Sequence, residues 1–318
     1  MRYVMFCFLY YYTLRVGIWE KHILTNLESL GIFLVGVVEM AEKIAQKTLL
    51  KSIPKRKTLS NKSDGGVALI VAGGAKFMGA GLLSALACTR SGAGYTHLMT
   101  DLVRYPWVKF PDFIVHKFSL ATLKKHSGNV IAMGPGLGTE KSKSRLLRAL
   151  LKIGAEKVIL DADALSILSQ MKVKTLPSSW ILTPHEGELA RLLHVPVKDV
   201  KTNREYYLQK AHLKFGCVIL LKGYKTLLAS KGKITYASFG SVALAKAGTG
   251  DVLLGVIAAL RAQGLEAYQA AALGVLIHGT AAKDWEKKGN DHLGLRPTDL
   301  IDQIPQTIKR LRSTAKGN

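Results

Sequence analysis

Short apolar runs alternate with helical patterns of polar and apolar residues from residue 67 onward. The runs that read as strands buried on both faces are VALIVAG (67–73), NVIAMG (129–134), KVILDA (157–162), WILT (180–183) and CVILLKG (217–223). Helical spacing is found between them at 80–94, 141–153, 164–171, 186–194 and 202–215. Strand, helix and strand in this rhythm predict right-handed crossovers and a mostly parallel sheet with helices on both faces.

The pattern changes near the C-terminal third of the chain. CVILLKGYKTLLAS and ITYAS read as consecutive strands joined by short turns, and three long helical stretches follow them. No shift in composition and no linker rich in Pro, Gly or Ser interrupts residues 60–305. The pattern therefore predicts one α/β domain over residues 40–318.

The first 39 residues have a different character. They contain two apolar stretches that are too short to span a bilayer, and no small-residue cleavage site follows the first. Met40 begins a more ordinary amphipathic segment, MAEKIAQKTLLKSI. We expect residues 1–39 to be an N-terminal appendage or the product of a start codon assigned too far upstream. N-terminal sequencing distinguishes the two, because a first residue before Met40 excludes the second.

Charge and cysteine content narrow the class of protein. The formal net charge is +23, from 45 Lys and Arg against 22 Asp and Glu, which suits nucleic acid, anionic membranes or small polyanionic ligands. The basic residues are spread along the chain with no arginine-rich tail, which disfavours a dedicated nucleic-acid module. The 3 cysteines lie far apart without C-x-x-C spacing, which disfavours both a zinc site and a disulfide framework and fits a reducing cytosol.

The stretch AKAGTGDVLLG (245–255) places one carboxylate, Asp251, at the start of an apolar run. A glycine-rich turn followed by a helix N-terminus binds phosphate well, and a carboxylate there repels phosphate unless it has a task such as accepting a proton. The alternative is structural: Gly248 or Gly250 supplies a positive φ and Asp251 caps the helix. The stretch alone does not separate these interpretations.

Further candidate stretches follow the predicted strands, where ligand crevices of open α/β sheets lie. GPGLG (134–138) is either a tight turn or a substrate cradle, and the acids of LDADAL (160–165) either hold a metal, water or ribose hydroxyl or cap a helix. In LTPHEGELARLL (182–193), His185 and Glu188 are three apart and share one face, although acids in a first helical turn are also favoured by the dipole. KGYKT (222–226) reads as a hairpin turn or as a nucleotide contact.

Taken together, these stretches resemble the ADP-dependent NAD(P)H-hydrate dehydratase family of the ribokinase-like superfamily. The resemblance covers about residues 45–305, and its pieces occur in the family's order: VAGGAKFMGAGLLSALACTRSGAG, GPGLG, LDADAL, TPHEGE, KGYKT, AGTGD and GVLIHGTAAKDW…GLRPTDLIDQIP. It implies a three-layer ribokinase-like fold and a repair reaction, in which hydrated NADH or NADPH is dehydrated at the expense of ADP, giving AMP and phosphate. The nearest alternative is a ribokinase-like kinase that phosphorylates a vitamin precursor.

The resemblance also implies roles for individual residues. Asp251 is the expected catalytic base, and Ala80, Gly136, His185 and Asp251 are expected to line the site for the hydrated dinucleotide. Lys222, Gly223, Tyr224, Lys225, Thr226 and Gly250 are expected to contact ADP or AMP. Glu188 stands where related kinases have a Glu implicated in binding Mg²⁺ and phosphate.

The sequence departs from the family pattern at a few positions. Ser241 replaces the usual Asn, Ser63 replaces a common Gly, and Lys283 replaces a small residue. The epimerase domain that often accompanies the family has no counterpart in these residues, so we expect a separate epimerase chain. By analogy with the family we expect a cytoplasmic homo-oligomer, a tetramer, that binds neither nucleic acid nor membrane.

Overall fold

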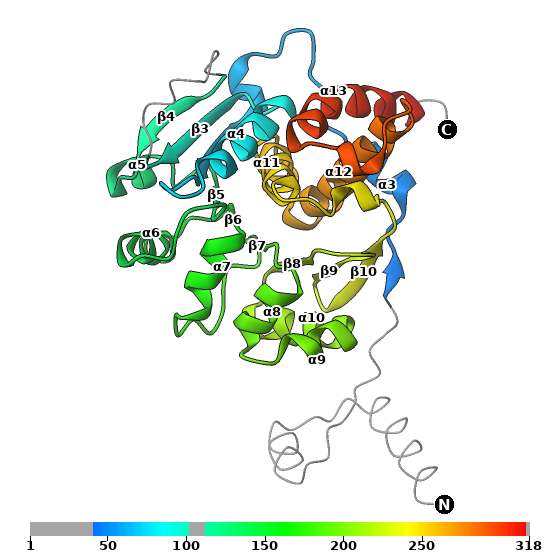
Figure 1. The fold of residues 1–318 in the computed structure, drawn as a ribbon. Helices are drawn as coiled ribbons and strands as arrows, with labels where there is room; N and C mark the ends of the chain where they lie inside the picture. The colour runs from blue at the N-terminus through cyan, green and yellow to red at the C-terminus, as the bar shows by residue number, and fades with distance from the viewer. Residues whose placement is uncertain (1–40, 102–111, 316–318) are drawn as a thin grey trace, which may run out of the picture. The chain divides into compact units, whose positions relative to one another are not determined.

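The computed structural model describes residues 41–101 and 112–315 (Figure 1). The interpretation of residues 1–39 and the environment of Cys7 lie outside these described residues. Cys88 and Cys217 are both buried, as expected for core cysteines, and burial raises the pKa of each thiol to about 12.

Ten strands of the described chain form one sheet, in the order β1-β10-β9-β8-β7-β6-β5-β2-β3-β4. Pairs from β8 to β4 are parallel, whereas β8–β9 and β9–β10 are antiparallel, and β1 pairs in parallel with β10. The bounds are β1 Glu42–Lys43, β2 Val67–Val71, β3 Tyr95–Thr100, β4 Ile114–Lys117, β5 Val130–Met133, β6 Val158–Leu160, β7 Ile181–Leu182, β8 Val218–Leu221, β9 Thr226–Ser230 and β10 Lys233–Ala237. The predicted mostly parallel sheet is confirmed, including the change to antiparallel pairing after β8.

Helices cover both faces of this sheet (Figure 1). On one side α11 packs against β2 and β5, together with α4, α12 and α13. On the other side α10 packs against β8 and β9, and α6, α7, α8 and α9 continue the layer. The bounds are α3 Gln46–Lys51, α4 Met78–Arg90, α5 Leu120–Lys125, α6 Lys141–Lys152, α7 Ala162–Ser169, α8 Glu186–Leu193, α9 Val197–Thr202, α10 Arg204–Phe215, α11 Thr249–Ala262, α12 Ala267–Glu286 and α13 Pro297–Thr314, with short 3₁₀ turns η1 Lys62–Gly65, η2 Val242–Leu244 and η3 His292–Gly294.

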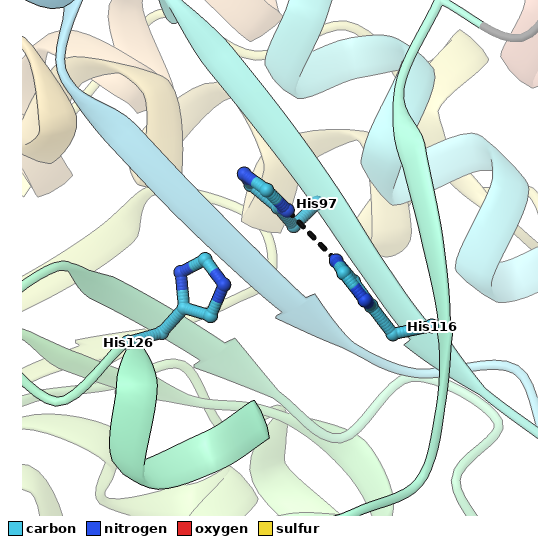
Figure 2. A group of neighbouring side chains, drawn as sticks. All are labelled: His97, His116 and His126. Carbon is cyan, nitrogen blue, oxygen red and sulfur yellow. Dashed lines mark hydrogen bonds between the residues drawn. The ribbon is translucent and has the colours of Figure 1, made fainter. Parts of the chain in front are cut away.

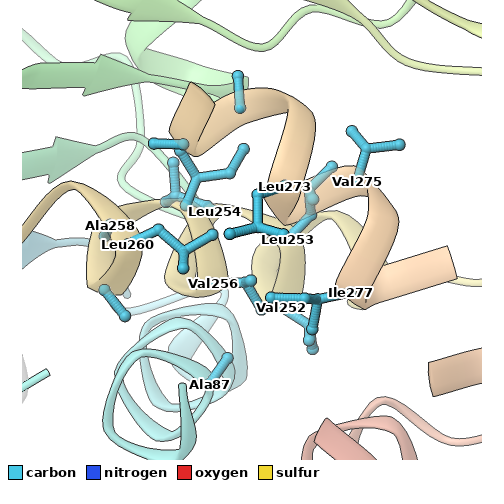
Figure 3. Close-up of a cluster of buried hydrophobic side chains, with 14 of the residues drawn as sticks. Ala87, Val252, Leu253, Leu254, Val256, Ala258, Leu260, Leu273, Val275 and Ile277 are labelled. Atoms are coloured by element: carbon cyan, nitrogen blue, oxygen red, sulfur yellow. The ribbon is translucent and has the colours of Figure 1, made fainter. Parts of the chain in front are cut away.

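The core around α11 explains why that helix is apolar on every side. It lies between the sheet, α4 and α12, so that every residue of Val252–Arg261 is buried (Figure 3). A Cβ at Gly255 would lie 2.2 Å from the backbone oxygen of Ser84, so only glycine permits α4 and α11 to approach this closely. This packing fixes the N-terminal end of α11, which carries Asp251.

Several sequence-based boundaries are corrected by the structure. The helix predicted over 202–215 begins later, at Arg204, because Asn203 leaves helical geometry at φ −135° and ψ 68° and caps the helix by accepting from the Tyr206 amide. Thr202 ends the preceding helix, α9. The predicted helix 164–171 begins earlier, at Ala162, and ends at Ser169. Strands β3 and β4 escaped prediction because each carries a histidine among its apolar residues. In the part of the chain that is described, no helix combines the length and the apolar character needed to cross a membrane.

Candidate active site

The candidate site is built at the carboxyl ends of adjacent parallel strands. The glycine loop GPGLG follows β5, Asp161 follows β6, His185 follows β7 and Lys222 follows β8. Because these strands are neighbours in the sheet, loops far apart in the chain meet at one edge. The N-terminal end of α11 brings Asp251 to the same place.

Lys222 lies at the centre of a group of carboxylates. Its Nζ is 2.6 Å from Asp161 Oδ1 and 3.7 Å from Glu188 Oε2. A Cβ at Gly250 would lie 3.8 Å from the same Nζ, and the charge of Asp251 acts on Lys222. We call Asp161, Glu188, Lys222 and Asp251 the acid–lysine cluster.

Burial and mutual charge set the protonation of this cluster. Burial, and to a lesser extent the charge of Asp161, raise the pKa of Asp251, whereas Lys222 lowers it, and the net result is a pKa of about 7. For Lys222, burial alone would lower the pKa, but the charges of Asp161 and Glu188 outweigh that effect and the pKa is raised. The cluster therefore holds a charged lysine beside a carboxyl group that gains and loses a proton near neutrality.

His185 and Glu188 form a reciprocal cap on α8. The Nδ1 atom of His185 accepts from the amides of Gly187 at 2.9 Å and Glu188 at 3.3 Å, and the His185 amide donates to Glu188 Oε2 at 2.8 Å. Glu188 Oε1 lies 3.4 Å from His185 Nε2. This cap fixes the His185 ring, which is exposed and has Nε2 available as a hydrogen-bond donor. Glu188 is buried.

The glycine loop after β5 packs on the segment between β2 and α4. Gly136 has φ +56°, and a Cβ there would lie 2.6 Å from Phe77 Cβ and 3.1 Å from Ala80 Cβ. The amide of Gly138 donates to Asp163 Oδ2 at 2.8 Å, which ties this loop to the start of α7. The structure therefore brings together Ala80 and Gly136, two residues expected to line the substrate site.

Hydrogen bonds to the preceding turn and to α12 hold the N-terminal end of α11. Gly248 has φ +91°, and Thr249 Oγ1 donates to the backbone oxygens of Leu244 and Lys246, each at 2.8 Å. Buried His278 of α12 donates from Nε2 to the Thr249 backbone oxygen at 2.9 Å, and burial lowers the pKa of His278 to about 4, so the ring stays neutral. No side chain of the described residues caps this helix, which leaves first-turn amides to an anionic ligand.

A pocket of about 520 Å³ lies beside this helix end. All six residues expected to contact the nucleotide line it: Lys222, Gly223, Tyr224, Lys225, Thr226 and Gly250. Ser241 also lines the pocket, and its Oγ donates to Glu286 Oε1 at 2.6 Å. Leu253 and Val275 form an apolar part of the wall. The side chain of Tyr224 is 85% exposed at its border. This mixture of apolar wall, exposed aromatic ring and backbone polar groups suits a nucleotide base with attached phosphates.

Two residues of the site, Arg204 and His278, were not identified as functional from the sequence, and a third, Asp161, was left open between ligand binding and helix capping. Arg204 donates from its guanidinium to the backbone oxygens of Tyr224 and Lys222, and pairs with Glu186 at 3.1 Å, so it shapes the Lys222–Thr226 turn. His278 supports Thr249, and Asp161 holds Lys222. LDADAL gave an open signal for Asp161, whereas Arg204 and His278 act through contacts between distant segments that no local pattern reveals.

A second group of ionisable side chains lies outside the pocket lining, on strands β3 and β4 and at the C-terminal end of α5. His97, His116 and His126 form it (Figure 2). Burial, together with the neighbouring imidazoles, lowers the pKa of His97 to about 4. The pKa values of His116 and His126 are lowered as well, chiefly by burial.

The sheet, its glycine turns and the pocket at the strand ends define an α/β protein of the open-sheet class, which places its ligand site at the carboxyl ends of the strands. A family model described as NAD(P)H-hydrate dehydratase matches residues 68–306, and the chain belongs to this family. It is 37% identical over 264 residues to the ADP-dependent (S)-NAD(P)H-hydrate dehydratase of Neisseria meningitidis, covering 80% of this chain and 87% of that protein.

A solved structure shares the fold closely. The ADP/ATP-dependent NAD(P)H-hydrate dehydratase from Bacillus subtilis, co-crystallised with ATP and Mg²⁺, matches with a TM-score of 0.77 at 29% identity, covering 86% of this chain and 99% of that chain. The predicted ribokinase-like fold is thereby confirmed. The Nnr bifunctional NAD(P)H-hydrate repair enzyme of Thermofilum pendens is 31% identical over 280 residues, covering 82% of this chain but 53% of that protein. The chain thus spans about half the length of several curated relatives that it matches.

Proposed function

We propose that this chain catalyses the ADP-dependent dehydration of (S)-NAD(P)H-hydrate, giving NAD(P)H, AMP and phosphate. The observation that carries the proposal is the placement of Asp251. Its carboxyl group, with a pKa of about 7, stands at the N-terminal end of α11 beside Lys222, which lines the nucleotide pocket. A base that must take a proton from an attacking hydroxyl works best with a pKa near the working pH.

The nucleotide half of the site is the pocket of about 520 Å³. The Lys222–Thr226 turn and Gly250 would contact ADP there, with Tyr224 stacking on the base. The uncapped first turn of α11 would receive the phosphates, since amide groups and the helix dipole both favour an anion at this end.

The dinucleotide half would be formed by Ala80, Gly136 and His185 around Asp251. The contact between Gly136 and the Phe77–Ala80 segment builds one wall of it. His185 Nε2, on an exposed ring fixed by the α8 cap, would donate a hydrogen bond to the substrate. The role that the sequence predicted for each residue is consistent with these positions.

The donor set also fits Mg²⁺. Asp161, Glu188 and Asp251 supply carboxylate oxygens, the ligand type that this cation prefers, and together they outnumber the single ammonium of Lys222. Glu188, with Asp161 and Asp251 nearby, would hold the ion. When bound, Mg²⁺ neutralises negative charge on the phosphates of the nucleotide.

The reaction would proceed in two steps. Asp251 takes the proton from the hydroxyl group on the hydrated nicotinamide ring, and the oxygen attacks the β-phosphorus of ADP, breaking the bond to AMP. The ring then carries a phosphate ester, whose departure as inorganic phosphate with loss of a neighbouring proton restores the double bond. The amides of the first turn of α11 would stabilise charge on the phosphoryl group in transfer.

Assembly and substrate supply are also proposals. The chain would work as a homo-oligomer, a tetramer by family analogy, which light scattering after size-exclusion chromatography tests. It would act on one epimer of the hydrate, so a mixture of epimers would be recovered only in part until an epimerase chain is added. The measurement is the NADH absorbance at the end of the reaction with and without that addition.

The activity test uses the full chain, chemically prepared NADH-hydrate, Mg²⁺ and ADP. We expect NADH, AMP and phosphate to form in equal amounts, and Asp251→Asn to lower kcat by about 10²–10⁴-fold, the usual contribution of a general base. Asp302→Asn removes an exposed carboxylate on α13 and serves as the matched control with unchanged turnover. Phosphate transfer from ATP to a vitamin precursor, without recovery of NADH, would instead identify a small-molecule kinase.

Asp251→Asn should not fail by unfolding. Because burial raises the folded-state pKa of Asp251 above its unfolded value of 3.8, ionising this group lowers stability as the pH rises toward 7. An amide escapes this penalty, so the variant should melt at or above the wild-type temperature at pH 8. A lower melting temperature there would show that its loss of activity is a folding defect.

A further inference from the structure

Three histidines from separate elements converge on the edge of the sheet. His97 lies on β3, His116 lies on β4, and His126 ends α5 as its C-cap residue (Figure 2). We call these residues the histidine cluster. Leu98, the neighbour of His97, belongs to the core that α4 and α11 cover, so alternation along β3 directs His97 to the opposite face of the sheet.

Their ring nitrogens are close enough to share one small ligand. Nδ1 of His97 and Nε2 of His116 are 2.8 Å apart and share a hydrogen bond, in which one nitrogen donates and the other accepts. The rings of His97 and His126 have their centroids 4.4 Å apart. One ring nitrogen from each of the three residues lies within 4.8 Å of the other two.

We propose that the histidine cluster binds one divalent transition-metal cation of the kind that prefers imidazole, with Zn²⁺ as the reference ion. Neutral imidazole nitrogen is a good ligand for Zn²⁺, Cu²⁺ and Ni²⁺, whereas Mg²⁺ prefers oxygen ligands. Three imidazoles leave a fourth tetrahedral position for water. The site is independent of the acid–lysine cluster, whose carboxylates suit Mg²⁺.

The geometry needs only side-chain adjustment. At a Zn–N distance of about 2.0–2.1 Å, ligand nitrogens of a tetrahedral site lie about 3.3 Å apart. The His97 and His116 nitrogens, now 2.8 Å apart, must separate by about half an ångström, and the nitrogen of His126 must move inward by at most about 1.5 Å. His97 and His116 are half-buried, which leaves room for their rings to rotate, whereas His126 is buried.

A bound cation would join three elements at the margin of the fold. β4 is the terminal strand of the sheet among the described residues and pairs with β3 alone. The cation would tie β4 to β3 and to the end of α5, in addition to the backbone pairing of the two strands. A ligand that binds the folded state alone raises its stability, so a cation bound here would stabilise this edge of the fold.

Lys125 provides a second test of the same site. Its positive charge acts on all three imidazoles, and its own side chain is exposed. A cation in the cluster would be repelled by this ammonium group. Replacing it with a carboxylate should therefore strengthen binding without altering any ligand.

The experiment uses the full chain without a histidine tag, stripped of metal, at pH 7.5 in millimolar Mg²⁺ to saturate oxygen-ligand sites. Co²⁺ is titrated while its visible d–d absorption is followed, and Zn²⁺ affinity is measured against a chromophoric chelator. We expect one tight equivalent, weakened at least tenfold by His116→Gln and by His97→Gln, and tightened severalfold by Lys125→Glu. His292→Gln, at an exposed histidine outside the cluster, should leave binding unchanged.

The controls separate this site from the proposed activity. Melting temperatures of the metal-free variants show that they fold, and Zn²⁺ should raise the melting temperature of wild type but not of His116→Gln. Turnover of NADH-hydrate should be the same in His116→Gln and wild type, so failure of the proposed function leaves this test intact. Equal Zn²⁺ affinity in wild type and His97→Gln/His116→Gln, or weaker binding in Lys125→Glu, would overturn the proposal.

Discussion

Asp251 shows how one residue can be tuned by its neighbours without any change in its covalent chemistry. Burial and the adjacent Asp161 both favour the protonated form, and Lys222 favours the carboxylate. The result is a pKa of about 7, compared with 3.8 for an unperturbed aspartate. At neutral pH such a group is present in both forms, which suits proton transfer to and from a substrate.

The pH dependence of turnover should report this balance. If Asp251 acts as a base, kcat/KM requires its carboxylate and should rise with pH to a plateau, with a midpoint near 7. Asp161→Asn removes a negative charge beside it, so the rising limb should shift to lower pH. The measurement is the initial rate of NADH formation from pH 5 to 9 in constant ionic strength.

Asp302→Asn, which changes an exposed carboxylate, should leave that midpoint in place. Asp161 also pairs with Lys222, and its loss allows Lys222 to act more strongly on Asp251, which shifts the midpoint in the same direction. A profile that falls with pH through neutrality, or a limb that moves upward in Asp161→Asn, would contradict the assignment of Asp251 as the base.

At the scale of elements, the sequence was most informative where a strand meets the loop that follows it. The α8 helix runs over Glu186–Leu193 as predicted, because Thr183-Pro184 ends the strand and a reciprocal cap starts the helix. Prediction failed where tertiary packing overrides pattern. β3 alternates between a face against α4 and α11 and a face that carries histidine, so its apolar run is interrupted.

The glycine loop after β5 offers a test of element packing. Gly136→Ala combines a left-handed φ of +56° with a Cβ only 2.6 Å from Phe77 Cβ. Gly154→Ala, at φ +65° with nothing within 4 Å, carries the backbone strain alone. Both should lose about 1–2 kcal/mol of unfolding free energy for the left-handed residue, and Gly136→Ala should lose more from the clash.

The two variants should also differ in kinetics. Gly136→Ala displaces the Phe77–Ala80 wall, so KM for NADH-hydrate should rise by tenfold or more, whereas Gly154→Ala should keep wild-type KM. Urea unfolding at 25 °C gives the stabilities, and initial rates give KM. Equal losses in both variants would mean that the contact with Phe77 contributes nothing to the loop.

At the scale of the whole molecule, the site is a product of topology. The six residues predicted to contact the nucleotide all line one pocket. They meet because the end of β8 and the beginning of α11 lie at the same edge of the sheet. These residues could be predicted from the order of their motifs in the sequence. The roles of Arg204, His278 and the histidine cluster could not, because each depends on contacts between segments that lie 18 or more residues apart.

The net charge of +23 acts on the molecule as a whole, and its effects on stability and on substrate binding should have opposite signs in salt. Screening weakens the repulsion among the excess cations, so the melting temperature should rise as NaCl increases from about 10 to 150 mM, over which the Debye length falls from about 30 to 8 Å. The same screening weakens the attraction of phosphate-bearing substrates, so KM for ADP should rise severalfold over that range. Calorimetry and initial rates in one buffer series measure both. A KM for ADP that does not change with salt would show that charge acts on the substrate only through short-range contacts such as Lys222 and the helix end. A melting temperature that falls with salt would show that the cations are already paired in the folded chain.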